Sequence, residues 1–237
     1  SMSESHSSQE PQPQERSSGE SSLLKASGVT GSMTLISRVL GLARDVVIAR
    51  VFGVGDGVDA FFVANKIPNF MRRLFAEGAF NQAFVPVLSE YRSTKSLSDV
   101  QRLINAVAGS LGGFLLIFTF VAVVAAPLIA VPIAYGFTDE PDKFALLVEM
   151  LRITFPYLLL VSMTALCGSI LNSYSRFAVP AVTPALLNVS LIVCSFFLVP
   201  YMRVPELALA WAVLIGGVAQ LLFQLPFLAR MRLMPVP

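Results

Sequence analysis

The chain has 237 residues and a formal net charge of +2; 55% of its residues are hydrophobic and 14% are charged. A soluble domain carries about 25% charged residues. The mean hydropathy here is +0.71, so the composition excludes an ordinary soluble protein. Four runs contain no charged residue, and each is long enough to cross a bilayer. These runs cover residues 103–138, 153–175, 177–202 and 207–229.

The charge-free runs are continuously apolar rather than alternating, which favours membrane helices over barrel strands. The fold class is therefore predicted to be an all-α integral membrane protein. Residues 1–22 are rich in Ser, Gln, Glu and Pro and are expected to form a disordered polar tail. Residues 23–237 are expected to form six transmembrane helices, with the second bent near Pro68. The expected helices cover residues 23–52, 59–91, 100–126, 143–172, 177–199 and 206–229.

Basic residues are distributed unequally between the two ends of these helices. The end that contains the N-terminus and the close of the sixth helix carries seven of them: Lys25, Arg92, Lys95, Arg102, Arg176, Arg230 and Arg232. The other end carries Lys143 and Arg203, with Arg50 at a helix end, beside the acidic segment FTDEPDK. Cytoplasmic loops are enriched in Lys and Arg, so both the N-terminus and the end of the sixth helix are expected to be cytoplasmic.

The first two expected helices contain an unusual concentration of charge. The basic residues there are Arg38, Arg44, Arg50, Lys66, Arg72 and Arg73, and the acids are Asp45, Asp59 and Glu77. A central Arg or Lys costs about 2.5–3.5 kcal/mol on insertion scales. Three acids leave three of the six positive charges unbalanced. We therefore expect a cavity in the membrane that attracts an anion; the alternative is a set of internal salt bridges that only joins two helices.

Helical periodicity divides these residues between faces. Two turns take about 7.2 residues, so Asp59, Lys66 and Arg73 share one stripe with Glu77, and Asn69 lies beside it. Asp59 is expected to compensate Lys66, and Arg73 to compensate Glu77. Arg72 points about 100° away from Arg73 and widens the polar face.

The first helix is less regular than the second. Arg38 and Asp45 share a face, whereas Arg44 and Arg50 are each rotated from the preceding arginine. Arg38 and Arg44 are the deeper candidates for a cavity. Arg50 lies next to a Gly-rich turn, so its side chain is expected to reach the membrane interface.

No motif in the chain indicates covalent chemistry. The sequence shows no His/Cys/Asp cluster with metal-ligand spacing, no nucleophile motif and no convincing phosphate loop. Cys167 and Cys194 are expected to be small buried hydrophobic residues. The amides Asn172, Asn188, Gln220 and Gln224 are expected to form hydrogen bonds between helices. We therefore predict a non-enzymatic protein with no catalytic residue, no metal, no cofactor and no nucleic-acid partner.

Four segments carry a resemblance to a known family: SRVLGLARDVVIARVFG, DAFFVANKIPNFMRRLFAEGAFNQAFVPVLSEY, LNSYSRFAVPAVTPALLN and LALAWAVLIGGVAQLLFQLP. They resemble the MurJ/MviN lipid II flippases of the MOP exporter superfamily. The resemblance implies one lobe of a two-lobe transporter in the bacterial inner membrane. It also implies that the diphosphate of the lipid-linked peptidoglycan precursor meets a cationic cavity. Family positions fall on Arg38, Arg44, Asp59 and Arg72, with Arg73 and Glu77 adjoining.

The chain stops after the sixth expected helix, whereas the family has a second lobe and a final helix pair. The resemblance therefore implies an N-terminal lobe whose C-terminal partner lobe is missing. Alternating access needs one lobe to move against the other, coupled to membrane potential or an ion gradient. Two alternatives stay open: a flippase for another lipid-linked oligosaccharide, and a membrane scaffold in cell-wall assembly. A multidrug exporter is disfavoured because its cavity would be acidic and aromatic, and a membrane transferase because no acidic metal-binding pair is convincing.

Overall fold

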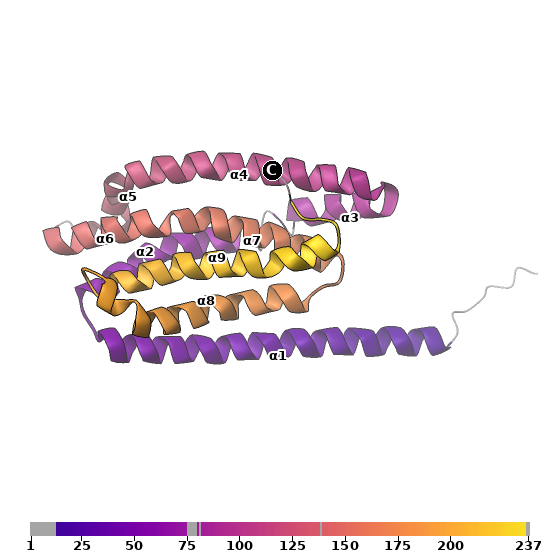
Figure 1. The fold of residues 1–237 in the computed structure, drawn as a ribbon, viewed down its shortest axis with the longest axis horizontal. Coiled ribbons are helices and arrows are strands. Elements are labelled where there is room, and N and C mark those ends of the chain that lie inside the picture. Colours follow the sequence, from indigo (N-terminus) through magenta and orange to yellow (C-terminus); the bar gives the residue numbers. More distant parts are fainter. Residues whose placement is uncertain (1–12, 75–79, 81, 138, 236–237) are drawn as a thin grey trace, which may run out of the picture.

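The computed structural model describes residues 13–74, 80, 82–137 and 139–235, and helices lying side by side dominate this part of the chain (Figure 1). The α-helices are α1 (Pro13–Phe52), α2 (Asp56–Arg73), α3 (Val85–Thr94), α4 (Leu97–Val124), α5 (Ala126–Ile133), α6 (Pro141–Thr154), α7 (Pro156–Ser173), α8 (Ala178–Phe197) and α9 (Leu207–Arg230). Two short 3-10 turns, η2 (Tyr135–Phe137) and η3 (Val199–Tyr201), lie in the connections.

The all-α membrane class is confirmed. Four helical stretches are long and apolar enough to cross a membrane: Leu97–Val124, Pro141–Ser173, Ala178–Phe197 and Leu207–Arg230. They correspond to the third to sixth predicted helices. The first two predicted helices, which carry the charges, appear as α1 and as α2 followed by α3.

Three boundaries differ from the prediction. Helix α1 begins at Pro13, so the polar segment 13–22 is helical rather than disordered, and residues 1–12 lie outside the described part. The fourth predicted helix is divided into α6 and α7 at Pro156, the first residue of α7, where proline's missing N–H is tolerated. Pro68 lies inside α2 and does not end it.

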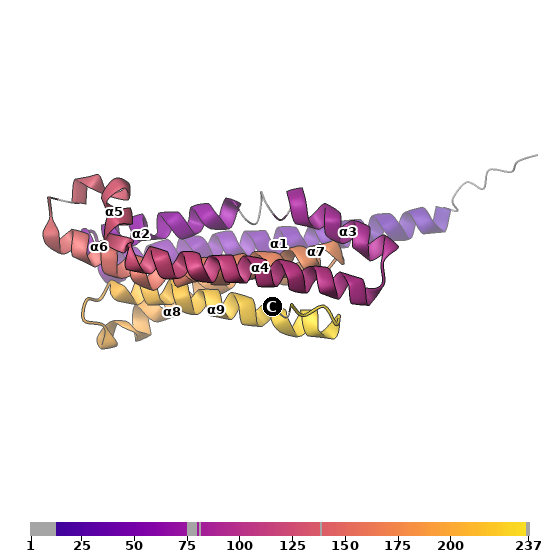
Figure 2. The ribbon, with the colours of Figure 1, turned by 90° about the horizontal axis from the view of Figure 1, so that it is seen from above.

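Helix α7 lies at the centre of the bundle, between α4 on one side and α9 on the other (Figure 1). Helix α1 is outermost and packs mainly on α8. Figure 2 shows α2 and α3 along one edge of the bundle and α8 and α9 along the opposite edge. This arrangement places α1 against α8 and α2 against α6, α7 and α9, which matters for the site below.

Two glycines allow α9 to approach its neighbours closely. A Cβ at Gly217 would lie 2.6 Å from Cδ2 of Tyr157 on α7, and one at Gly216 would lie 2.8 Å from Cδ1 of Leu187 on α8. Small residues at such positions let helix backbones come close within a membrane. Helices α7, α8 and α9 therefore pack as one tight unit.

Candidate anion-binding site

Arg44 and Asn188 join α1 to α8. The Arg44 side chain is 32% exposed, and its Nη1 donates a hydrogen bond of 2.9 Å to Oδ1 of Asn188. Asn188 is buried and donates from Nδ2 to the carbonyl oxygen of Ser37 at 3.2 Å. The expected interhelical bond of Asn188 is thus confirmed, although the sequence did not indicate that its partner would be Arg44.

The carboxylate of Asp45 lies against the guanidinium of Arg44. Nε and Nη2 of Arg44 are 3.1 Å and 3.0 Å from Oδ1 of Asp45. Helical phase had placed Asp45 on the face of Arg38, but the structure pairs it with its immediate neighbour. Arg38 is exposed on α1, and no ion pair of its side chain occurs in the described part of the chain.

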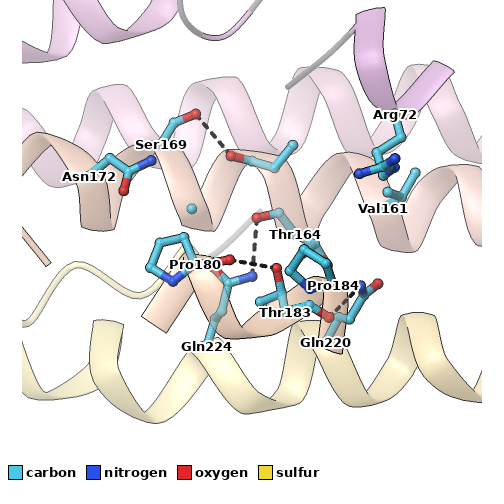
Figure 3. A pocket seen from close by; sticks show the side chains of 12 residues that line it. Arg72, Val161, Thr164, Ser169, Asn172, Pro180, Thr183, Pro184, Gln220 and Gln224 are labelled. Atoms are coloured by element: carbon cyan, nitrogen blue, oxygen red, sulfur yellow. Dashed lines mark hydrogen bonds between the residues drawn. The ribbon is translucent and has the colours of Figure 1, made fainter. Parts of the chain in front are cut away.

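Arg72 lies in the last turn of α2 and lines a cavity of about 270 Å³ (Figure 3). The rest of the lining comes from α7, α8 and α9: Val161, Thr164, Ala165, Gly168, Ser169, Asn172, Pro180, Thr183, Pro184, Gln220 and Gln224. The guanidinium is half-buried, and within the described residues it has no acidic partner. Its Nε is buried without any hydrogen-bond acceptor among those residues.

The cavity wall is hydrogen-bonded at some atoms and open at others. Gln220 donates from Nε2 to the carbonyl oxygen of Thr183 at 2.8 Å, and Gln224 donates from Nε2 to that of Thr164 at 3.2 Å (Figure 3). Oε1 of Gln224 and Oγ1 of Thr164 are buried and find no partner in the described structure. The interhelical role expected for both glutamines is therefore confirmed, and Gln224 also presents an unused acceptor.

Arg44 and the cavity of Arg72 adjoin the same stretch of α8. Arg72 shares its cavity with Thr183 and Pro184, and Arg44 bonds Asn188. Pro184 and Asn188 are four residues apart, which is about one helical turn. Helices α1, α2 and α8 thus bring two of the predicted cations to one short segment.

The remaining charges of α2 form an outward-facing stripe. Asp59, Lys66 and Arg73 are all exposed, whereas Ala60 and Ala64 are fully buried on the opposite face. Asn69, beside the stripe, is half-buried. The stripe predicted from a stride of seven is therefore present. Glu77 lies outside the described residues, and so does its expected pairing with Arg73.

Asp59 pairs with Lys143 of α6, which corrects the expected pairing with Lys66. Nζ of Lys143 lies 3.3 Å from Asp59, 3.5 Å from Asp56 and 3.6 Å from Glu140. The ammonium group also lies 4.1 Å from the ring centroid of Phe137, and the Lys143 side chain is only 11% exposed. Helix α6 packs on α2, so the first turns of both helices meet.

Arg50 is exposed in the last turn of α1, at the helix end where an interfacial side chain was expected. Cys167 and Cys194 are buried free thiols, as expected. No group of three or more potential metal ligands occurs in the part of the chain that the structure describes.

Membrane-spanning helices around a half-buried guanidinium, with no acidic partner among the described residues, define an integral membrane protein with a polar, cationic cavity. The sequence profile described as "Lipid II flippase MurJ" matches residues 48–237. The chain belongs to this family.

Individual members of the family are similar to this chain in sequence and in structure. A Vibrio cholerae protein named "Probable lipid II flippase MurJ" is 47% identical over 215 residues, which cover 88% of this chain and 41% of that protein. The "Lipid II flippase MurJ" of Burkholderia cenocepacia is 42% identical over 214 residues, covering 90% and 42%. A solved structure, "Lipid II flippase MurJ, inward closed conformation", matches with a TM-score of 0.67 and 30% identity, over 81% of this chain and 40% of that one. The chain thus spans about two fifths of the length of these relatives.

Proposed function

We propose that this chain acts as one lobe of a lipid II flippase and that Arg38, Arg44 and Arg72 attract the diphosphate of the lipid-linked precursor. The observation that carries the proposal is the cavity beside Arg72, where a guanidinium with a buried, unbonded Nε has no acid within the described residues. A buried charge is costly unless it is paired and hydrogen-bonded. An anionic ligand would supply both a negative charge to pair with the guanidinium and an acceptor for its Nε.

Arginine suits this ligand because its planar donors bind phosphate oxygens in pairs. Asn188 and Asp45 already hold the side chain of Arg44 in one orientation. Binding therefore loses less side-chain entropy than it would with a freely moving arginine. Lys66 and Arg73, on the exposed stripe of α2, would add long-range attraction without a fixed contact. Asp59, held by Lys143, would fix the start of α2 rather than meet the ligand.

The head group would enter from the cytoplasmic side while its polyprenyl tail remains in the lipid, and a lobe-against-lobe movement would expose it on the other side. A partner lobe, the inner membrane and coupling to membrane potential or an ion gradient belong to this proposal. No covalent step and no cofactor are required. The distribution of basic residues supports cytoplasmic placement of the N-terminus and of the end of α9.

The test uses a chimera in which this chain replaces the matching segment of the Vibrio cholerae relative. The chimera is expressed in bacterial cells depleted of their own lipid II flippase, and growth is measured. Arg44→Ala and Arg72→Ala are expected to abolish growth support, with Arg50→Ala as the matched control that retains it. In nanodiscs, Arg72→Ala should weaken lipid II binding about tenfold or more, because hydrogen bonds to charged groups contribute about 1.5–3 kcal/mol.

Three results would oppose the proposal in different ways. Full growth support by both alanine variants at normal protein levels would show that the cations do not serve transport. Tighter binding of an undecaprenyl-linked oligosaccharide than of lipid II would favour another lipid-linked substrate. Absence of any lipid diphosphate binding, with growth still supported, would favour a scaffold in cell-wall assembly.

A further inference from the structure

The cavity beside Arg72 changes character with distance from the guanidinium. Among the described lining residues Arg72 supplies the only charge, and the other polar groups there are neutral amides, hydroxyls or backbone oxygens (Figure 3). We propose that this inner part is a pocket for the sugar unit joined to the diphosphate. The inference rests on the proposed function and deepens it, because it assigns substrate specificity to Gln224 and Thr164.

The strongest evidence is the pair of unused polar atoms. Gln224 is 1% exposed and Thr164 is 8% exposed, yet Oε1 of the first and Oγ1 of the second have no partner in the described structure. Leaving such a buried polar atom unbonded is unfavourable, because it has lost its hydrogen bonds to water. A ligand that donates hydrogen bonds would remove that cost on binding.

The chemistry of these atoms selects a neutral donor rather than a second anion. Oε1 of Gln224 can only accept a hydrogen bond, and a hydroxyl can both donate and accept. Sugar hydroxyl and N-acetyl groups provide both functions, whereas a phosphate offers only acceptors to Oε1. The rings of Pro180 and Pro184 add apolar surface to the same lining, which suits the C–H faces of a sugar ring.

The size of the cavity limits the ligand further. About 270 Å³ is near the lower end of the roughly 300–1,000 Å³ typical of small-molecule pockets. It suits one sugar ring and is too small for a disaccharide that carries a peptide. Arg72, in the same lining, places the phosphate next to this ring, as the covalent order of a sugar diphosphate requires.

Gly168 provides a way to fill the pocket without breaking the fold. A Cβ there would lie 3.5 Å from Oε1 of Gln224 and 3.6 Å from Cβ of Pro180, which are ordinary van der Waals distances. Gly168→Ala is therefore expected to fold, and it would place a methyl group against the unused acceptor. Alanine also has a higher helix propensity than glycine.

The experiment compares two ligands on the chimera in nanodiscs: lipid II, and undecaprenyl diphosphate, which lacks the sugar. Gln224→Leu, Thr164→Val and Gly168→Ala should each weaken lipid II binding about three- to tenfold, which is the value of one or two hydrogen bonds. Binding of undecaprenyl diphosphate should stay within about twofold of the unmodified chimera. Arg72→Ala should weaken both ligands.

Thr119→Val on α4 is the matched control, because Thr119 is also buried with an unpartnered Oγ1 but does not line the cavity. It should leave both affinities unchanged. Equal loss for both ligands, or no loss with Gly168→Ala and Gln224→Leu, would overturn the sugar pocket and leave a cavity that holds only water. If the unmodified chimera bound neither ligand, the proposed function itself would fail.

Discussion

Single polar side chains tie the charged helices to the rest of the bundle. Asn188 holds Arg44, and Lys143 holds the first turn of α2 through Asp56 and Asp59. Neither contact could be predicted from the sequence, because helical phase relates residues along one helix only. The stripe of Asp59, Lys66 and Arg73 was predictable for the same reason: it depends on local geometry alone.

Lys143→Met is expected to destabilise the protein, because it leaves three neighbouring carboxylates without their cation. These carboxylates are 54–70% exposed, so water screens their repulsion. We expect a small fall in Tm at low salt, because ion pairs to exposed carboxylates contribute little to stability. Thermal unfolding in detergent at low and high salt would measure it, and the difference should shrink at high salt.

Two variants make that measurement specific. Lys143→Arg keeps the charge and should retain most of the stability. Lys95→Met removes an exposed lysine at the opposite end of the bundle and should leave Tm unchanged. A wild-type Tm for Lys143→Met at low salt would show that the cluster does not stabilise the fold.

At the level of helices, charge-free runs predicted α4, α7, α8 and α9 well, since length and hydropathy suffice for a membrane helix. The division between α6 and α7 was missed because a proline is compatible both with a kink and with a helix start. The cavity could not be predicted either. Its lining comes from four helices, and an amide within an apolar run indicates a hydrogen bond without identifying the partner.

Gly217→Ala is expected to loosen the packing of α9 on α7. The added Cβ would lie 2.6 Å from the ring of the buried Tyr157, so the ring or the helix must move. Overpacking of this kind costs about 1–3 kcal/mol. The free energy of unfolding in mixed micelles should fall by that amount.

Gly113→Ala on α4 is the matched control. No atom lies within 4 Å of the added Cβ, so this change should leave stability equal or slightly higher. Equal stability of the two variants would show that the α7–α9 contact accommodates the added methyl group without loss of stability.

At the scale of the whole molecule, the turn between α3 and α4, the turn between α7 and α8 and the end of α9 gather at one end (Figure 1). Most of the basic residues outside the helices lie there, including Lys95, Arg176 and Arg232. The acids around Lys143 lie at the opposite end, beside the turn between α1 and α2.

This unequal distribution of charge between the two ends predicts which turns face the outside of the cell. In a background with Cys167 and Cys194 replaced by alanine, Val54→Cys should react with a membrane-impermeant maleimide in intact cells. Lys95→Cys should react only after the membrane is opened. Both positions are exposed, so access rather than burial decides the result. The reverse pattern would invert the proposed orientation.

In the proposed transport cycle, the guanidinium of Arg72, which has no acidic partner among the described residues, would also determine which half of the cycle responds to voltage. A bound diphosphate offsets the positive charge of the cavity, so the loaded lobe moves little net charge through the membrane field. The empty lobe still carries that charge, and each elementary charge that crosses the full potential is worth about 2.3 kcal/mol per 100 mV. An inside-negative potential would therefore draw the empty cavity back toward the cytoplasmic side, so resetting would be the electrogenic half of the proposed cycle.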